Sequence, residues 1–361
     1  MSNNFKLEST NHIKDRYDDI HKLRSSFDKQ NTVTNRRSYN HEYYSWKLRM
    51  NPFGKGVCNI VEADGQTVGM ATVTPKKMTL PNNTETAVEI GDTFTHSNYQ
   101  RKGIFSKVVN SVRDQAQKNE MNFIYGTPNS NSLPGYLKKL NFDIIESANV
   151  SNFVFPININ NILRVKIKSK VFSYIINILT SPIIKIIRYF NKSKIDSSYV
   201  IEEVSLFSND INKVWLHEKH KYDCAIDRND EYLNWRFVDN PDKYNIFIAK
   251  KNDSICGYVV LKSGFWSGLK VGYIADILTI DDGSHDVFDA LLEHSIDYYK
   301  KMNFDMISSW IQLGCYSQRL SKSGFYKYKP VPIICFKNHL GLDIIKSNYS
   351  WYFTISDSDN I

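Results

Sequence analysis

The spacing of hydrophobic residues along this 361-residue chain switches repeatedly between the period of a strand and that of a helix. Residues 86–95 are rich in β-branched side chains and predict a strand. After a short polar stretch, apolar side chains recur every three or four positions, which predicts a helix that begins near residue 104. Another strand is predicted at 123–126. This order of strands and helices indicates an α/β fold with a mixed sheet.

The chain contains an internal repeat. Residues 42–52 align with residues 231–241 at an offset of 189, so that Trp46 and Pro52 each meet the same residue type in the second copy. Two strand-like runs follow in each copy, at 57–62 and 67–74 and then at 245–250 and 255–262. Self-similarity of this kind predicts two copies of one supersecondary plan, and the length of the chain also fits two domains.

A basic segment separates the two copies. Between residues 151 and 195 there are eight basic residues and no acidic ones, so this segment alone accounts for the net charge of +8. The predicted organisation is a first domain at 1–150, a basic amphipathic helical linker at 151–198 and a second domain at 199–361. The linker either packs on both domains or lies, through residues 160–194, on an anionic membrane surface. No nucleic-acid motif accompanies these charges, so no nucleic-acid partner is expected.

The turn between the first strand and its helix has the chemistry of a phosphate site. Gly103 has no side chain that would keep a phosphate away from the backbone. The N–H groups at the start of a helix point outward and carry partial positive charge. Arg101 and Lys102 add full positive charges at the same place. The turn therefore predicts a diphosphate site at the beginning of the helix.

The first copy resembles the GNAT superfamily of acyl-CoA-dependent N-acyltransferases. Gln100 and Gly103 match its Gln/Arg-x-x-Gly-x-Gly/Ala motif, whereas Phe105 stands where the motif has Gly or Ala. The strand 123–126 and the segment 136–142 follow in the order of the family. The resemblance implies two GNAT-like domains in tandem, the first holding acetyl-CoA or another acyl-CoA, without a metal. The residues expected at this co-substrate are Phe94, Thr95, Gln100, Arg101, Lys102, Gly103, Ile104, Phe105, Ser106 and Asn131.

The same resemblance implies a carboxylate on the strand before the loop, as the base that takes a proton from the acceptor amine. Glu89, eleven residues before Gln100, and Asp92 are the two candidates. A tyrosine often protonates the leaving thiolate in this family, but its position is occupied here by Leu137. One helical step turns a side chain by about 100°, so the neighbouring Tyr136 serves only if the local helix geometry brings it in. For Asn131, helix capping explains the residue as well as a cofactor contact does.

The equivalent loop of the second copy lacks this chemistry. At a local offset of 184, Val287 falls opposite Gly103, and Asp281 and Asp282 lie close to the predicted helix start. Carboxylates at that place would repel a diphosphate. Only the first copy is therefore predicted to bind acyl-CoA, and the second is expected to be a wall of the acceptor site or a scaffold.

The predicted activity is transfer of an acetyl group from acetyl-CoA to the primary amine of a small acceptor. The favoured acceptor is an amino sugar of surface-polysaccharide assembly, carried on a nucleotide or a lipid. A protein or peptide acceptor is the rival within the same activity. Two alternatives of other classes also stay open: a Fem-like transferase that uses aminoacyl-tRNA, and a non-catalytic ligand-binding protein of the same fold. Five well-separated cysteines predict neither disulfides nor a zinc site. The first residues lack a signal-peptide pattern, so a cytoplasmic location is expected, with or without contact to the membrane. The sequence leaves the oligomeric state open.

Overall fold

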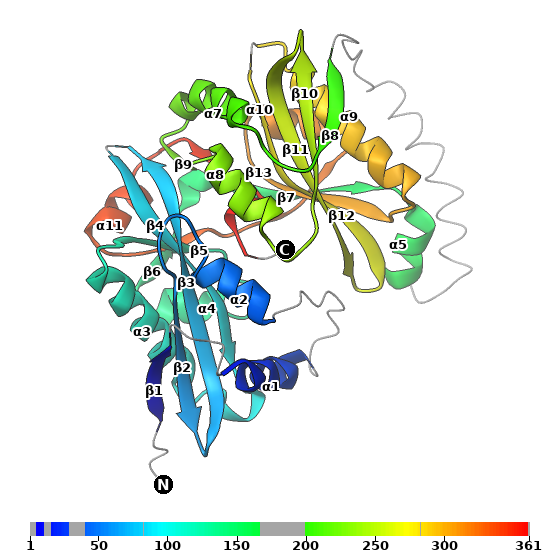
Figure 1. Cartoon of the computed structure of the whole chain (residues 1–361). Helices are drawn as coiled ribbons and strands as arrows, with labels where there is room; N and C mark the ends of the chain where they lie inside the picture. Colours follow the sequence, from blue (N-terminus) through cyan, green and yellow to red (C-terminus); the bar gives the residue numbers. More distant parts are fainter. Residues whose placement is uncertain are drawn as a thin grey trace.

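Two twisted sheets, each with helices against it, make up the molecule (Figure 1). The computed structural model describes residues 5–10, 16–28, 40–81, 83–166, 199–281 and 283–359.

The first sheet has the strand order β1-β2-β3-β4-β5-β15-β6, and β9, which carries β16, adds to it beside β3. Because β4 is antiparallel to β3 and parallel to β5, the sheet is mixed, as the sequence predicts. Its strands are β1 (Lys6–Thr10), β2 (Val57–Ala63), β3 (Gln66–Leu80), β4 (Asn83–Thr95), β5 (Phe123–Gly126), β6 (Phe142–Ile144), β9 (Cys224–Ile226), β15 (Ile334–Phe336) and β16 (Trp351–Tyr352).

The second sheet has the order β14-β7-β13-β12-β11-β10-β8. It repeats the plan of the first, since β12 is antiparallel to β11 and parallel to β13. Its strands are β7 (Val150–Pro156), β8 (Val200–Val204), β10 (Asn245–Lys251), β11 (Ser254–Trp266), β12 (Leu269–Thr279), β13 (Met306–Gln312) and β14 (Tyr326–Pro330).

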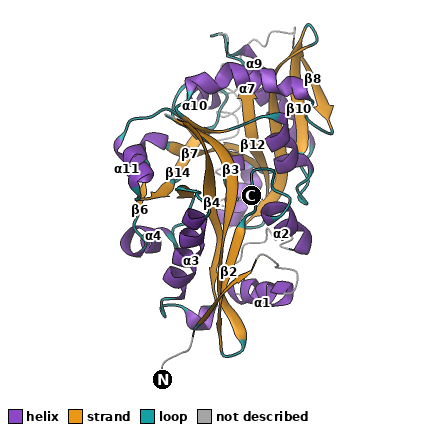
Figure 2. Ribbon diagram, turned by 60° about the vertical axis from the view of Figure 1, so that its left-hand side comes forward, coloured by secondary structure: helices purple, strands orange, loops and turns teal. Residues whose placement is uncertain are grey.

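Helices cover both faces of the first sheet. Figure 2 shows α3 and α4 on one face and α1 and α2 on the other. The amphipathic pattern that begins near residue 104 is α3, whose apolar side chains, among them Val108 and Val112, are buried. The helices of the described chain are α1 (Tyr17–Asp28), α2 (His41–Leu48), α3 (Ile104–Lys118), α4 (Leu133–Lys139), α5 (Ile159–Lys166), α7 (Asn212–Glu218), α8 (Asp230–Leu233), α9 (Asp286–Lys301), α10 (Cys315–Lys322) and α11 (His339–Lys346).

The two sheets exchange strands. β7 follows the first copy in sequence but pairs with β13 and β14 of the second sheet. In return, β15 of the second copy lies between β5 and β6 of the first sheet. Residues 151–156, which the sequence analysis assigned to the linker, are therefore strand. Of that linker, only α5 follows in the described chain, and residues 167–198 lie outside the described residues.

The repeat is visible as a pair of stacked tryptophans. The rings of Trp46 and Trp235 lie 4.9 Å apart with an interplanar angle of 18°. Each indole N–H donates to the backbone carbonyl of the other tryptophan, at 2.6 Å from Trp46 and 3.3 Å from Trp235. Both belong to one buried core cluster that runs through the two copies. The alignment at an offset of 189 thus marks the contact between the copies.

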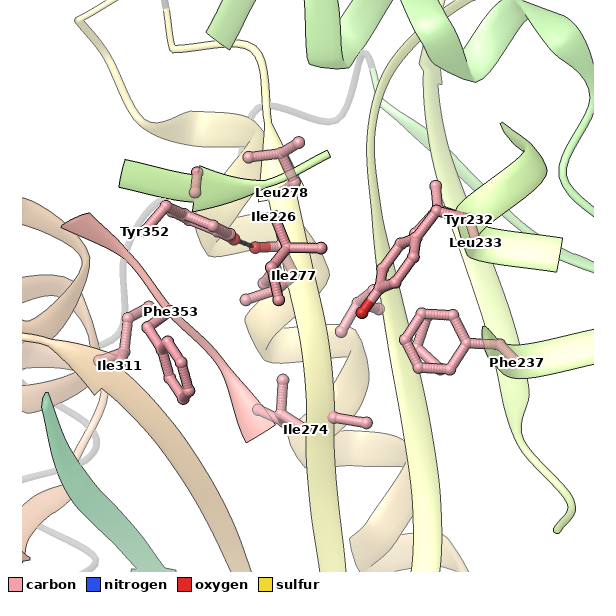
Figure 3. Packing of buried hydrophobic residues seen from close by; sticks show 14 of the residues in the cluster. Ile226, Tyr232, Leu233, Phe237, Ile274, Ile277, Leu278, Ile311, Tyr352 and Phe353 are labelled. Atoms are coloured by element: carbon pink, nitrogen blue, oxygen red, sulfur yellow. Dashed lines mark hydrogen bonds between the residues drawn. The ribbon is translucent and has the colours of Figure 1, made fainter. Parts of the chain in front are cut away.

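A segment from the second copy runs back to the first. Residues 351–358 are buried, and they contain β16 and the 3₁₀ turn η7 (Ile355–Asp357). In Figure 3, Tyr352 and Phe353 of this segment pack on β12 and β13, and the Tyr352 hydroxyl donates to the carbonyl of Ile277. The segment then continues to the strand β4 of the first copy, where Asp359 meets Glu89.

Candidate active site

Strand β4 stops pairing with β5 close to the candidate carboxylates Glu89 and Asp92. The parallel ladder between these strands ends at the Glu89–Tyr125 pair. Beyond it the register of β4 against β3 shifts, and Asp92 has a left-handed backbone with a φ of 44°. A bulge of this kind bends a strand and re-aims its side chains. Phe94 and Thr95 consequently pair with β3 and lie past the end of the β5 ladder.

The loop before α3 is open and positively charged. Gly103 is the N-cap of α3 with a φ of 81°, and a Cβ added there would meet no atom within 4 Å. Arg101 also has a left-handed backbone, and Gln100, Arg101 and Lys102 are exposed. The first N–H groups of a helix have no partner within it and can bind an anion. The residues present therefore fit the diphosphate of an acyl-CoA, with Gly103 leaving the approach clear.

Tyr99 anchors this loop. Its hydroxyl donates to Asp64 at 2.5 Å and accepts from the amide of Gln66 at 3.1 Å. The ammonium group of Lys102 lies 4.7 Å from the centre of the Tyr99 ring. A cation at this distance from an aromatic face is attracted to it. The contact holds one of the two predicted phosphate-binding cations beside the loop.

The departure from the family motif at Phe105 is compensated on α4. The Phe105 ring packs on Gly135, where an added Cβ would lie 2.7 Å from a ring carbon. The same ring meets Tyr136 edge-on at 5.1 Å. Gly135 thus provides the space that a small residue at position 105 would provide in the motif.

The remaining residues expected at the co-substrate surround the start of α3 and α4. Ile104 is buried against Gly69 of β3, and Ser106 is half-buried in the first helical turn. Asn131 is exposed before α4 but does not cap it. Instead, the side-chain oxygen of Asn129 accepts the backbone N–H groups of Asn131 and Ser132. Capping is therefore the wrong explanation for Asn131, and its contact with the co-substrate stays a prediction.

Glu89 lies in a buried ionic cluster. Its carboxylate contacts the ammonium group of Lys76 at 2.5 Å and accepts the backbone N–H of Asp359 at 2.9 Å. Only 2% of Glu89 is exposed. Burial and the nearby Asp359 carboxylate raise the pKa of Glu89 above its ordinary value, against the opposing charges of Lys76 and Lys47. A carboxylate with a raised pKa is a stronger proton acceptor than an exposed one.

Asp92 belongs to the same cluster but has a different partner. Its carboxylate contacts Lys47 of α2 at 2.7 Å, and Lys47 also contacts Asp359 at 2.5 Å. Burial alone would lower the pKa of Lys47, but the carboxylates of Asp359 and Asp92 raise it well above its ordinary value. Lys47 is therefore held as a cation that fixes the two carboxylates. The structure places both candidate bases in one cluster, in which Glu89 contacts Lys76 and Asp92 contacts Lys47.

Tyr136 faces β4. Its hydroxyl lies 3.1 Å from that of Thr93, next to the bulge, and its ring is buried. Burial raises the pKa of Tyr136 to about 12, so its phenol stays protonated at neutral pH. A protonated phenol beside the end of the β5 ladder is suited to give a proton to a leaving thiolate. Leu137, at the usual tyrosine position, packs instead against the apolar core of the first copy.

The segment 351–359 was missed by the sequence analysis. Besides Asp359, it presents the carbonyl of Asp357 to the hydroxyl of Tyr125 at 2.9 Å and to Lys76 at 3.0 Å. On the second copy, Arg236 donates to the carbonyls of Ser356 and Ser358. No periodicity marks this segment. The one available signal was that the repeat aligns Lys47 with Arg236, two buried cations that both require partners.

The loop before α9 in the second copy differs in length from the loop before α3. α3 and α9 begin after Gly103 and His285, both N-caps with positive φ, so His285 and not Val287 is the counterpart of Gly103. The loop from β12 to α9, residues 280–285, is two residues shorter than the loop 96–103. This corrects the local offset used in the sequence alignment. Asp281 lies beside His285, while Asp282 is outside the described residues.

Comparison with known proteins agrees with this geometry. Residues 14–145 match the family model described as an acetyltransferase (GNAT) domain. The match covers most of the first copy. No curated protein matches the sequence.

Solved structures extend the likeness to both copies. N-myristoyltransferase of Saccharomyces cerevisiae, solved with bound myristoyl-CoA and inhibitors, superposes with a TM-score of 0.64 over 93% of this chain and 80% of its own, at 13% identity. A tandem GNAT protein from the clavulanic acid biosynthesis pathway matches over 91% of this chain and 98% of its own, with a TM-score of 0.59 and 10% identity. A fungal multi-domain β-N-acetylglucosaminidase with a GCN5-related glucosamine N-acetyltransferase region matches with a TM-score of 0.57 and 10% identity, over 93% of this chain and 38% of its own. The fold is thus that of two GNAT-like units in tandem, as predicted.

None of the helices in the described ranges is both long and apolar enough to cross a membrane. Most of the segment 160–194, for which membrane contact was an alternative, falls outside those ranges.

Proposed function

We propose that the first copy transfers an acyl group from acyl-CoA to the primary amine of a small acceptor, and that this acyl group is acetyl. One observation carries this proposal: the strand β4 leads from the buried carboxylate Glu89, past the end of the β5 ladder, to the open loop at Gly103. A proton acceptor and a diphosphate site thus lie on one continuous piece of chain. The GNAT domain found over residues 14–145 supports the same reading.

Each predicted residue has a place in this reaction. The loop 100–106 would hold the diphosphate, and the backbone of Phe94 and Thr95 would bind the pantetheine arm. Glu89 is the favoured acceptor for the amine proton because of its raised pKa. Tyr136 would return a proton to the leaving thiolate. The bound acyl-CoA supplies the activated thioester.

The charge of the ionic cluster favours a cationic acceptor. Three carboxylates, those of Glu89, Asp92 and Asp359, share the two ammonium groups of Lys47 and Lys76. A protonated amine that approached them would supply an opposite charge and would find a proton acceptor at the same place. An amino sugar carried on a nucleotide or lipid is our proposed acceptor. The fold neighbour with a glucosamine N-acetyltransferase region supports this choice.

Titration calorimetry with acetyl-CoA tests the loop. Gly103→Glu should abolish detectable binding, because a carboxylate there repels the diphosphate. Gly283→Glu is the matched control, since Gly283 also has a left-handed backbone, with a φ of 89°, and an open Cβ direction. It should bind like the wild type. Equal binding by the Gly103→Glu protein would refute the assignment of the loop.

The acceptor is tested by measuring thiol release from acetyl-CoA with a panel of nucleotide-linked amino sugars, simple amines and peptides. Release that depends on an amino sugar supports the full proposal. Release with peptides alone would replace the acceptor class. Binding of acetyl-CoA without release for any amine would favour the non-catalytic alternative, and salt-sensitive binding of tRNA without acetyl-CoA binding would favour the Fem-like one.

A further inference from the structure

Three side chains with reactive groups, those of Cys315, His285 and Asp281, lie next to one another in the second copy. Cys315 begins α10, and its Sγ lies 2.9 Å from Nε2 of His285, the N-cap of α9. The other ring nitrogen of His285, Nδ1, lies 2.8 Å from a carboxylate oxygen of Asp281. A thiol in contact with an imidazole, with a carboxylate close to the other ring nitrogen, places a nucleophile beside a base.

Asp281 is fixed beside the imidazole by several hydrogen bonds. Its backbone N–H donates to Glu218 at 2.9 Å, and its own carboxylate accepts the backbone N–H of Gly283 at 2.9 Å. Lys221 donates to the Asp281 carbonyl at 3.3 Å. His285 itself is fixed by its left-handed backbone at the start of α9. The His285 ring therefore lies between the Asp281 carboxylate at Nδ1 and the Cys315 thiol at Nε2.

The arrangement is suited to nucleophilic chemistry rather than to metal binding. In the ranges that the structure describes, no three His, Cys, Asp or Glu side chains converge as ligands of one ion. Cys315 is exposed, whereas Cys58, Cys224 and Cys335 are buried and Cys256 is half-buried. The thiol that has the imidazole is thus also the one that a reagent in solution can reach.

The His285 imidazole provides the base that the Cys315 thiol needs to lose its proton. Burial and the charge of Asp281 raise the pKa of the Cys315 thiol, against the opposing charge of Lys322, so little thiolate forms without help. A base in direct contact can remove the proton as the sulfur attacks. His285 Nε2 is in that position.

We propose that Cys315, His285 and Asp281 form a thiol–disulfide exchange site, at which Cys315 is modified by small disulfides. His285 takes the Sγ proton while Sγ attacks one sulfur of the disulfide. The disulfide bond breaks, a new bond joins Sγ to the attacked sulfur, and the departing thiolate receives the proton from His285. Cys315 is oxidised and the departing sulfur is reduced, so no further oxidant is needed. The inference is independent of the proposed acyl transfer in the first copy.

The full-length protein is treated with 2-hydroxyethyl disulfide at neutral pH, and the rate of modification at each cysteine is followed by peptide mass spectrometry. Cys315 should react at least about tenfold faster than Cys256, the scale expected of general-base help. His285→Asn is the decisive variant, because asparagine tolerates the left-handed backbone while removing the base. It should slow Cys315 by at least about tenfold and leave Cys256 unchanged.

A second measurement separates base removal from local unfolding. The rate at Cys315 is recorded against pH, with the thermal melting of both proteins as a check of folding. In the His285→Asn protein the rate should rise steeply with pH, because the reaction then depends on ionisation of the bare thiol, whereas the wild-type rate should rise less steeply, because a base in contact with Sγ takes its proton. Equal rates and equal pH profiles in the two proteins, or faster reaction at Cys256, would overturn the proposal.

Discussion

At Glu89 the chain places a carboxylate where it makes contact with a lysine, a backbone N–H and a second acidic residue, out of reach of bulk water. Burying a charge costs free energy unless partners compensate for it. Here the partners stabilise the carboxylate, yet the pKa of Glu89 remains raised because burial and, after it, the Asp359 carboxylate oppose its ionisation. Perturbed carboxylates of this kind concentrate at functional sites. Asp92, whose carboxylate contacts Lys47, is the second candidate base.

Glu89→Gln is the test of this assignment. The amide keeps a hydrogen-bonding oxygen for the Asp359 N–H but cannot take a proton, so kcat for acetyl transfer should fall by about 10²- to 10⁴-fold. In the wild type, kcat should rise with pH through the raised pKa of Glu89, because only the ionised form accepts the proton. The variant should lose that rise.

Its control is the affinity for acetyl-CoA, measured by calorimetry, which should be unchanged because Glu89 lies away from the loop at Gly103. A variant that kept the wild-type kcat and its pH profile would contradict the role of Glu89. In that case Asp92→Asn, tested in the same assay, should show the fall in kcat.

Among the elements, α3 and α4 form the walls of the predicted co-substrate site. They meet where the Phe105 ring lies over Gly135, so the departure from the family motif on one helix is matched by a glycine on the next. A glycine inside a helix normally costs stability relative to alanine. Its presence here is explained by the space that the ring requires.

Gly135→Ala should therefore destabilise the protein by about 1–3 kcal/mol, the usual cost of overpacking, although alanine is the better helix former. Urea unfolding measures the change. In a Phe105→Leu background the smaller side chain leaves room for the new methyl group, and the same substitution should cost little. Equal costs in the two backgrounds would mean that the ring contact does not limit this position.

The two copies share a core, so we expect the whole molecule to unfold as one unit. The stacked Trp46 and Trp235 donate to each other's backbone, and the strands β7 and β15 each complete the sheet of the opposite copy. The segment 351–359 adds a third connection, since Arg236 of one copy and Lys47 of the other both hold it. The proposed active site of the first copy is therefore completed by residues of the second.

Unfolding in urea should accordingly give one cooperative transition by both tryptophan fluorescence and circular dichroism. Trp46→Ala should lower the free energy of unfolding by about 3–5 kcal/mol, because it removes a buried ring and leaves the partner indole stacked on a cavity. Trp266→Ala, at a site where 38% of the side chain is exposed, should cost much less. Two separate transitions in the wild-type protein would show that the copies fold independently.

The sequence predicted the parts of the fold that follow from local spacing. The strand before residue 95, the helix after Gly103 and the paired strands of each copy are signalled by side-chain period and glycine placement, which act over a few residues. The tandem plan followed from the repeat at Trp46 and Trp235. The loop at Gly103 was predictable for the same reason, because its left-handed backbone and its neighbouring cations are consecutive in the chain.

The rest was decided only by tertiary contact. Glu89 and Asp359 are separated by 270 positions, and the exchange of β7 and β15 joins strands from opposite halves of the chain. The contact between His285 and Cys315 in the second copy likewise joins residues 30 positions apart. Such contacts leave no period in the sequence, because each depends on where a finished sheet places its edges and not on the residues beside it. Local chemistry thus determined where acyl-CoA is expected to bind, and only the assembled sheets decided which carboxylates share the buried cluster beside it.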